Sequence, residues 1–183
     1  MAEHSDDKEL LYMFKNPETR EQGFTRIIKK YQEKLYWHVR RMVVDHDDAN
    51  DVLQNMFIKV WNGLDNFRED SQLYTWLYRI GTNECLTFLE QQKKRSSISL
   101  NDVENGLSNR LKADKHFDPN KLEWKLQLGI QKLPEKQRAV FNLRYYDEMP
   151  YEEMSRVLET SEGALKASYH HAVKKIEDFI LNH

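Results

Sequence analysis

The sequence predicts an all-α protein made of two small helical domains joined by a polar linker. Apolar residues recur at three- and four-residue intervals through most of the 183-residue chain, and the alternation typical of strands is nowhere sustained. Glycine and proline are scarce, with six and four copies. One long polar segment, residues 96–120, divides the chain into an N-terminal domain of residues 1–95 and a C-terminal domain of residues 121–183.

Four helices are expected in the N-terminal domain, because four segments carry apolar residues on one face at helical spacing. The three longer apolar stripes can bury one another as a small bundle. The lone cysteine, Cys85, falls in the last of these segments and is expected to be a small buried residue. The predicted spans are Lys8–Phe14, Thr19–Val43, His46–Leu64 and Ser71–Lys94.

The segment of residues 96–120 is rich in Ser, Asn, Asp and Lys, and Pro119 stands near its end. This composition predicts a flexible linker, in which a few spaced apolar residues favour at most a weak helical turn. Fully extended, such a linker spans roughly 80 Å at about 3.3 Å per residue. As a free coil, its ends lie only about 25–30 Å apart.

Four further helices are expected in the C-terminal domain. Pro134 and Pro150 stand where a first helical position falls, and each is followed by glutamates that suit the positive end of a helix. Ser161 is expected to cap the last helix through its hydroxyl. The predicted spans are Lys121–Lys132, Pro134–Tyr146, Pro150–Leu158 and Ser161–Leu181.

The last two of these helices, with a short connection between them, have the proportions of a helix-turn-helix. An ordinary four-helix core is the alternative interpretation of the same pattern. In a helix-turn-helix the two helices pack against each other through their apolar faces. The expected contact joins Tyr151, Met154, Val157 and Leu158 to Leu165, Tyr169, Ala172 and Ile176.

The composition excludes several classes of protein. The net charge is −2, whereas free-standing DNA-binding proteins usually carry a positive surface that neutralises phosphates. Any DNA contact is therefore expected to be local, or to be supported by a larger assembly. No apolar run approaches the roughly 20 residues that cross a bilayer, and the first residues lack a secretory signal pattern. With one cysteine, the chain is expected to work in the reducing cytoplasm.

Three motifs, in this order, resemble those of the bacterial extracytoplasmic-function (ECF) RNA polymerase sigma factors. They are DANDVLQNMFIKVW at residues 48–61, FREDSQLYTWLYRIGTNE at residues 67–84, and LPEKQRAVFNLRYYDEMPYEEMS at residues 133–155, followed by SEGALK. The resemblance covers most of the chain beyond about residue 20. It implies a protein that binds core RNA polymerase and directs promoter-specific initiation through the −10 and −35 elements.

In that family, the N-terminal domain reads the −10 element and the C-terminal domain reads the −35 element. The two elements lie about 17 base pairs apart, which is roughly 60 Å of duplex at about 3.4 Å per pair. An extended linker spans this distance and a relaxed coil does not. Polymerase is therefore expected to hold the linker stretched.

The resemblance implies that a polar row on the helix of residues 46–64 contacts the clamp helices of the largest polymerase subunit. Carboxylates and amides suit this task because they pair with Arg and Lys on a helical partner. Phe57 and Trp61, on the apolar side of the same helix, are expected to be core residues. The polymerase-binding residues are predicted to be Asp48, Asp51, Gln54 and Asn55.

The second motif resembles the −10 reader, in which a flipped base needs planar or hydrogen-bonding side chains. Trp76 is expected to pack inside the bundle, and Glu90 disfavours extensive phosphate contact on that face. The basic run at the end of this segment, residues 91–95, is interpreted equally well as a solvated helix end or as a DNA contact. The predicted −10 residues are Arg68, Tyr74, Arg79, Asn83, Lys93, Lys94 and Arg95.

The last helix is expected to lie in the major groove at −35, with side chains near its start reaching base edges. Lys166 is expected to donate to guanine, and Arg144 on an earlier helix to anchor a phosphate. Relatives carry arginines at several positions where this chain does not, which predicts weak −35 binding without polymerase. The predicted −35 residues are Arg144, Ser161, Glu162, Gly163, Lys166, Ala167, His170 and His171.

The sequence carries no nucleophile–base signature and no phosphate-cradling glycine loop, so no enzymatic activity, cofactor or small-molecule substrate is expected. His170 and His171 are neighbours that point about 100° apart on a helix, so they cannot chelate a metal together. An anti-sigma factor is the other implied partner, and it would hold the protein at the inner membrane if membrane-anchored. Two alternatives remain, a stand-alone helix-turn-helix regulator and an interaction module that has lost its DNA function.

Overall fold

The computed structural model describes residues 2–95 and 122–182, and the predicted linker of residues 96–120 lies outside them. Within the described residues the chain is built of helices, as the sequence predicts. The N-terminal helices are α1 (Ala2–Lys15), α2 (Arg20–Val43), α3 (His46–Gly63), the 3₁₀ turn η1 (Leu64–Asn66) and α4 (Leu73–Arg95). The C-terminal helices are α6 (Leu122–Gln131), α7 (Glu135–Tyr145), α8 (Tyr151–Leu158) and α9 (Glu162–Asn182).

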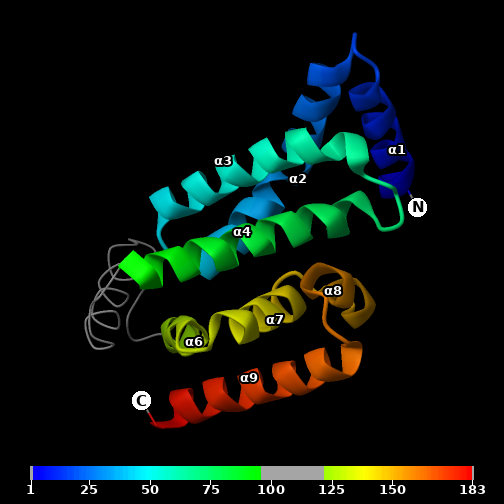
Figure 1. The fold of residues 1–183 in the computed structure, drawn as a ribbon. Coiled ribbons are helices and arrows are strands. Elements are labelled where there is room, and N and C mark those ends of the chain that lie inside the picture. Colours follow the sequence, from blue (N-terminus) through cyan, green and yellow to red (C-terminus); the bar gives the residue numbers. More distant parts are fainter. Residues whose placement is uncertain (1, 96–121, 183) are drawn as a thin grey trace.

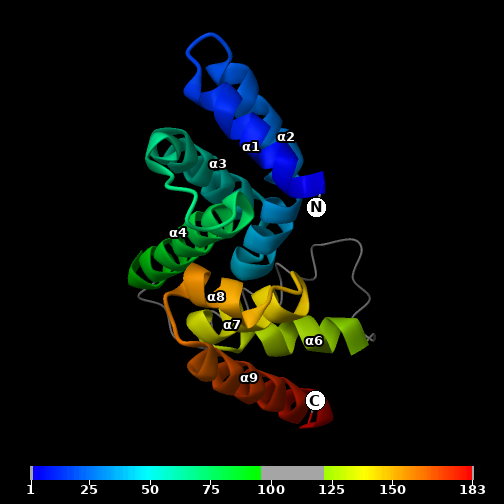
Figure 2. The ribbon, with the colours of Figure 1, turned by 90° about the vertical axis from the view of Figure 1, so that its right-hand side faces the viewer.

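The helices form successive layers along one long direction of the molecule (Figure 1). Helix α1 lies at one end with the first part of α2, which runs alongside α3 and α4 until its last turns reach α7. Helices α6, α7 and α8 follow, and α9 lies at the other end. The view turned by 90° shows the same order, with α4 of the N-terminal domain facing α8 of the C-terminal domain (Figure 2). The two domains are therefore in direct contact, and α4 lies between its own bundle and the C-terminal helices.

Most predicted helix boundaries are confirmed to within one or two residues. Helix α1 is longer than expected, because its first turns carry polar residues without an apolar stripe. Pro134 and Pro150 are predicted at the first helical position, but they stand at the N-cap, one residue before the observed first helical residues Glu135 and Tyr151. Ser161 caps α9 as predicted, since its Oγ accepts a hydrogen bond from the Ala164 N–H at 3.3 Å.

A sharp corner joins α2 to α3. The β-branched Val44 has φ 71°, a region that such residues rarely adopt, and the Asp45 N–H donates to the Val43 carbonyl at 2.9 Å. Asp45 then caps α3, because its Oδ1 accepts from the N–H groups of Asp47 and Asp48 at 2.9 and 3.1 Å. The corner fixes the direction in which α3 begins.

Apolar side chains from α1 to α4 form the N-terminal core, including the fully buried Ile27, Leu35 and Leu77. Phe14 of α1 packs against Phe24 of α2 and Trp61 of α3, with ring centroids 6.1 and 5.3 Å apart. Helix α1 is therefore an integral part of this bundle.

Cys85 is fully buried, as predicted, and burial raises the pKa of its thiol.

The helix-turn-helix contact is confirmed only for the first half of α9. Leu165 joins the same apolar cluster as Met154 and Val157 of α8. Ala172 and Ile176 pack instead against α6 and α7, so the prediction that they contact α8 is wrong. Helix α9, at 21 residues, is much longer than the eight-residue α8, so its second half extends past α8 and covers other helices.

Gly23 of α2 permits the close approach of α1. A Cβ atom at this position would lie 2.7 Å from the Phe14 backbone nitrogen and 2.9 Å from Met13 Cβ. At Gly163 of α9, in contrast, a Cβ atom would meet no neighbouring atom within 4 Å. The two glycines therefore form a matched pair for testing the packing of α1.

We expect Gly23→Ala to lower the free energy of unfolding by about 1–3 kcal/mol, because the added methyl group forces α1 away from α2. Gly163→Ala should raise it by up to about 1 kcal/mol, because alanine favours a helix over glycine. Urea denaturation of both variants measures these changes. Equal stabilisation by both substitutions would contradict the packing described for α1.

Candidate nucleic-acid and protein-binding surfaces

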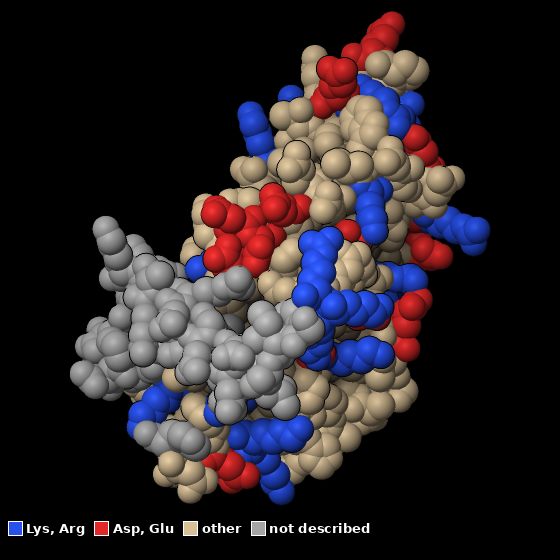
Figure 3. Space-filling view, turned by 60° about the vertical axis from the view of Figure 1, so that its left-hand side comes forward, with Lys and Arg blue, Asp and Glu red and all other residues tan. Residues whose placement is uncertain are grey.

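The polar row of α3 lies on the outside of the N-terminal bundle. Asp51, Gln54 and Asn55 are exposed, whereas Asp48 is half-buried beneath the N-cap of the helix. Figure 3 views the molecule from the side where α3 begins and α4 ends, and shows a patch of acidic side chains with basic side chains gathered beside it. The exposed part of the row can accept hydrogen bonds from a basic partner.

Next to this row, α3 presents apolar side chains at the surface. Phe57 and Trp61 pack against the core, as predicted, but both remain only partly buried. Together with Phe24, Gln54 and Ile58 they line a shallow groove of about 360 Å³. Ile58 is 54% exposed. The polar row and the apolar groove form one continuous surface, because Gln54 belongs to both.

The loop before α4 and the start of that helix hold the first predicted −10 residues. Arg68 is exposed, and its neighbour Glu69 is held by Lys15 of α1 through an ion pair of 3.0 Å. Tyr74 is half-buried, with its ring 4.4 Å from that of Tyr78. Burial, with the nearby charge of Asp147, raises the pKa of Tyr74 to about 12. Tyr74 is therefore a neutral hydrogen-bonding group at physiological pH.

Further along α4, the predicted −10 residues differ in their surroundings. Asn83 and Arg95 are exposed. Lys94 pairs with Glu90 on its own helix at 2.8 Å, which lowers the pKa of Glu90. Lys93 forms an ion pair with Glu135 of α7. Arg79 is likewise paired with an acid of the C-terminal domain, Glu159, at the end of α8.

Polar contacts that the sequence did not predict join the two domains. The buried Thr75 hydroxyl donates a hydrogen bond to the Glu153 carboxylate of α8. His38 of α2 is fully buried, with its Nε2 2.9 Å from Thr82 Oγ1 and its Nδ1 3.1 Å from Asp147 Oδ2. Tyr78 and Arg41 also donate to Asp147 Oδ1, at 3.2 and 3.4 Å.

The end of α2 is also bound by side chains of the C-terminal domain. The Arg41 carbonyl accepts from Gln131 Nε2 at 2.9 Å, and the Met42 carbonyl accepts from Arg138 Nη1 at 3.0 Å. These carbonyls belong to the last turn of a helix, where no N–H of the same helix can satisfy them. Burial lowers the pKa of Arg138 to about 10, partly opposed by the charge of Glu135.

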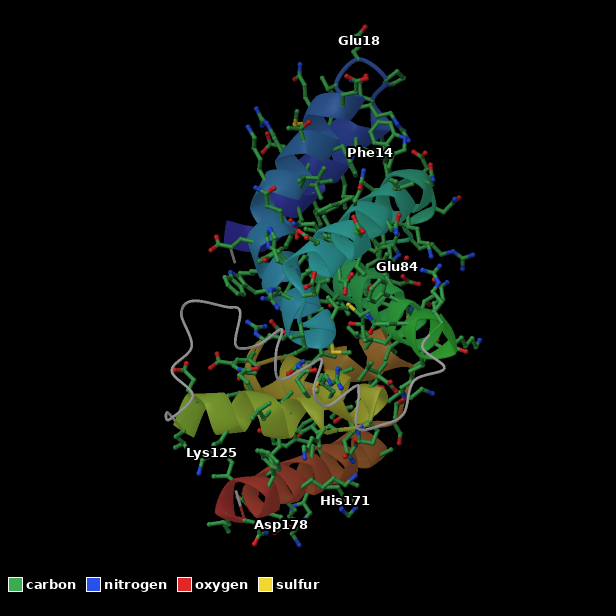
Figure 4. All side chains as sticks on the ribbon, turned by 90° about the vertical axis from the view of Figure 1, so that its left-hand side faces the viewer. Phe14, Glu18, Glu84, Lys125, His171 and Asp178 are labelled. Carbon is green, nitrogen blue, oxygen red and sulfur yellow. The ribbon has the colours of Figure 1, made fainter. Side chains whose placement is uncertain are left out.

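The predicted −35 face is the outer side of α9. Ser161, Glu162, Gly163, Lys166, Ala167, His170 and His171 are all exposed. Lys166 pairs with Glu162 one turn earlier at 3.6 Å, and Tyr169 on the opposite side stacks against Phe141 with centroids 5.7 Å apart. Figure 4 shows His171 and Asp178 on α9, away from the N-terminal helices. This face is open to a ligand in the conformation described.

Arg144 lies apart from that outer face. Its Nη1 donates to the Met149 carbonyl at 3.1 Å, and its guanidinium lies 5.0 Å from the centre of the Tyr151 ring. The side chain therefore braces the loop between α7 and α8. A phosphate contact by Arg144 would use the guanidinium N–H groups that do not bind the Met149 carbonyl.

No group of three or more metal-ligating side chains is found in the part of the chain that the structure describes. The rings of His170 and His171 lie 6.0 Å apart and are tilted relative to each other. None of the helices within residues 2–95 and 122–182 is long and apolar enough to span a bilayer.

Comparisons with known proteins match both domains. Residues 27–95 match Sigma-70 region 2, and residues 124–176 match Sigma-70 region 4. The ECF RNA polymerase sigma-E factor of Escherichia coli is 32% identical over 166 residues, which cover 86% of each chain. The chain belongs to the ECF sigma factor family. The RNA polymerase sigma-H factor of Pseudomonas aeruginosa is 29% identical over 97% of this chain and 95% of its own.

Two solved structures share the fold of this sigma factor. One is CnrH in complex with the cytosolic domain of CnrY, with a TM-score of 0.67 and 21% identity over 96% of this chain and 97% of its own. The other is the sigma factor RpoE of Bartonella quintana in complex with the anti-sigma factor NepR, with a TM-score of 0.63 and 21% identity. It covers 86% of this chain and 96% of its own.

The match to both Sigma-70 regions establishes the role of the protein. It is an RNA polymerase sigma factor that acts in promoter-specific transcription initiation. The residues matched to region 2 begin within α2 and run through α3 to the end of α4, whereas α1 precedes them. Sigma factors are not, in general, a family of enzymes.

We expect the ion pair between Glu135 and Lys93 to stabilise the sigma factor in a pH-dependent way. Burial alone would raise the pKa of the Glu135 carboxyl. The hydrogen bond and charge of Lys93, a hydrogen bond from a backbone N–H and the charge of Arg138 together lower it by more. The pKa of Glu135 therefore lies below its ordinary value of 4.5. A lowered carboxyl pKa stabilises the fold above pH 4.5, and this contribution is lost as the pH falls through the folded-state pKa.

Because the Lys93 side chain is 69% exposed, screening should limit the contribution to about 0.5 kcal/mol. Glu135→Gln should therefore be less stable than the parent at about pH 6, and the difference should shrink at about pH 3.5. Urea denaturation at both values measures it, with Glu177→Gln as a control on exposed α9 surface. A difference that stays constant with pH would contradict the assignment.

Proposed function

We propose that the polar row of α3 binds the clamp helices of the largest subunit of RNA polymerase. The observation that carries this proposal is the exposure of Asp51, Gln54 and Asn55 on a rigid helix whose other side is anchored in the bundle. Asp48, which is half-buried, stands at the edge of the row. The adjoining groove lined by Phe57, Ile58 and Trp61 adds an apolar contact beside the charged one.

We infer that α4 and the loop before it read the −10 element as single-stranded DNA. Tyr74 and Asn83 offer a ring and an amide to a flipped base, while Arg68 and Arg79 neutralise phosphates nearby. Lys93, Lys94 and Arg95 extend the positive charge to the end of the helix. Because Arg79 and Lys93 are paired with acids of the C-terminal domain, those pairs have to open before DNA binds.

We further propose that the outer face of α9 enters the major groove at −35. This face is exposed along its first three turns, from Ser161 to His171, as a recognition helix requires. Lys166 provides a donor for guanine, and His170 and His171 provide donors for bases or phosphate. Arg144, on α7, would anchor a DNA phosphate. The small number of fixed positive charges makes this contact dependent on polymerase.

The partners proposed for this sigma factor are core polymerase, promoter DNA and an anti-sigma factor. The proposal of an anti-sigma partner is supported by the structural relatives, because one of them was solved with the anti-sigma factor NepR. The protein would carry out no chemistry of its own. It would work in the cytoplasm, unless a membrane-anchored anti-sigma factor holds it at the inner membrane.

Run-off transcription with core polymerase on a library of genomic fragments tests the whole proposal. Start-site-selective RNA that depends on the added protein is the expected result. A stand-alone regulator would instead bind duplex promoter DNA tightly without polymerase. Failure to direct selective initiation with a cognate core enzyme, in the absence of any inhibitor, would overturn the proposal.

We expect Asp51→Arg to weaken association with core polymerase by at least about tenfold, because a basic side chain would face a basic partner. Helical content should be unchanged, since Asp51 is exposed. Pull-down of core polymerase measures the effect. Asp178→Arg, the same charge change on α9, is the control, and equal affinity for both variants would refute the clamp assignment.

We expect Lys166→Ala to leave polymerase association intact and to reduce promoter discrimination by about tenfold, because one base contact is lost. Transcription from promoters with single −35 substitutions measures discrimination. Lys174→Ala removes the same charge two turns further along α9. If both lysine variants change discrimination equally, the effect is electrostatic and the base contact is wrong.

A further inference from the structure

We propose that Lys15 and Arg20, which lie where α1 ends and α2 begins, position the −10 loop without touching DNA. The −10 loop is the connection of residues 67–72 between η1 and α4. Both basic residues precede the residues matched to Sigma-70 region 2, which begin at position 27. The inference rests on the proposed role of this loop and of α4 in reading the −10 element.

Arg20 is fixed by contacts of two kinds. Its guanidinium donates two parallel hydrogen bonds to the Asp65 carboxylate in η1, at 2.8 and 2.7 Å. The same group lies over the rings of Phe14 and Trp61, 3.9 and 4.9 Å from their centres. A planar guanidinium held on a carboxylate and on two rings keeps one orientation, whereas most surface ion pairs leave both side chains mobile. Arg20 therefore ties the turn before the −10 loop to the aromatic side chains of the bundle.

Lys15 holds the −10 loop at a second point. Its Nζ lies 3.0 Å from Glu69 Oε1, and in Figure 1 the connection from α3 to α4 lies on the same side of the bundle as α1. Glu69 has φ 59°, in the left-handed region that residues other than glycine rarely adopt. Such a conformation persists where the surrounding structure holds it. The ion pair with Lys15 is a contact that does so.

The held residues lie on both sides of Arg68, the predicted DNA contact of the loop. Phe67 is buried against Trp76, with ring centroids 5.2 Å apart, and its N–H donates to the Leu64 carbonyl at 3.2 Å. Phe67 and Glu69 therefore fix the backbone before and after Arg68, which is exposed. Because a binding side chain is aimed by the backbone that carries it, these contacts determine where Arg68 meets DNA.

The two basic residues also offset negative charge beside Arg68. The loop and the turn before it carry three exposed acids, namely Asp65, Glu69 and Asp70. Carboxylates repel DNA phosphates, whose binding depends on local positive charge. Lys15 and Arg20 pair with two of these three acids. The contacts thus favour DNA binding at Arg68 both by shape and by charge.

Substitutions in the full-length chain test this inference. The double variant, Lys15→Gln with Arg20→Gln, removes both contacts. Lys15→Arg keeps a cation for Glu69 and should behave as the parent does. The control, Arg26→Gln with Lys29→Gln, removes the same two charges from the exposed face of α2.

The first measurement is the rate at which trypsin cleaves the free protein after Arg68, followed by mass spectrometry. A protease cuts a held loop only when the loop opens locally, so the double variant should be cut at least about fivefold faster than the parent. The control and Lys15→Arg should be cut at the parent rate. If far-UV circular dichroism shows that the double variant has lost helicity, Lys15→Gln alone decides, because the Lys15 side chain is 49% exposed.

The second measurement is run-off transcription with core polymerase from promoters that carry single substitutions in the −10 or the −35 element. The double variant should lose about tenfold in −10 discrimination, because one stacked base contributes about that factor to binding. Its −35 discrimination and its association with core polymerase should be unchanged. A loss of folded protein would instead lower transcription from every promoter alike.

An unchanged cleavage rate or unchanged −10 discrimination in the double variant would overturn the inference. An equal loss in the control, or in Lys15→Arg, would do the same. Failure of the proposed function looks different. If the parent directs no selective transcription, the −10-reading role is wrong, and the cleavage rates alone then decide whether Lys15 and Arg20 hold the loop.

Discussion

The packing of α8 against α4 is the interaction on which the rest of the structure depends. On one side α4 completes the N-terminal bundle, and on the other it receives α7 and α8 of the C-terminal domain. Apolar residues of both domains join in a single cluster there, and Asp147, Glu153 and Glu159 add specific polar contacts around it. Two side chains of the proposed −10 reader, Arg79 and Lys93, are therefore paired with acids of the other domain in this structure.

The proposed polymerase-binding surface is built differently, because it depends only on the N-terminal domain. The strained corner at Val44 and the N-cap at Asp45 set the direction of α3, and the exposed polar row follows from that direction. The C-terminal domain touches this corner through Gln131 and Arg138, which satisfy carbonyls in the last turn of α2. The proposed polymerase-binding surface is thus exposed while the two domains are in contact.

Much of the fold could be predicted from the sequence, because helical periodicity depends on local spacing. The spans of α2, α3, α7, α8 and α9 were within one or two residues, and Ser161 was correctly identified as a cap. The packing of Ala172 and Ile176 was wrong, because an apolar face shows that a residue is buried but not which helix buries it. The contacts of Thr75 and His38 were missed for the same reason, since nothing in the local sequence distinguishes their partners.

The sequence by itself determined the helices, the division into two domains and membership of the sigma factor family, because these follow from local periodicity and from motifs in a given order. Only the tertiary structure decided that Arg79 and Lys93 are paired with acids of the other domain, far along the chain. Such pairing depends on how two domains approach each other in space. That approach is set by the sum of many weak contacts, none of which leaves a pattern in the chain.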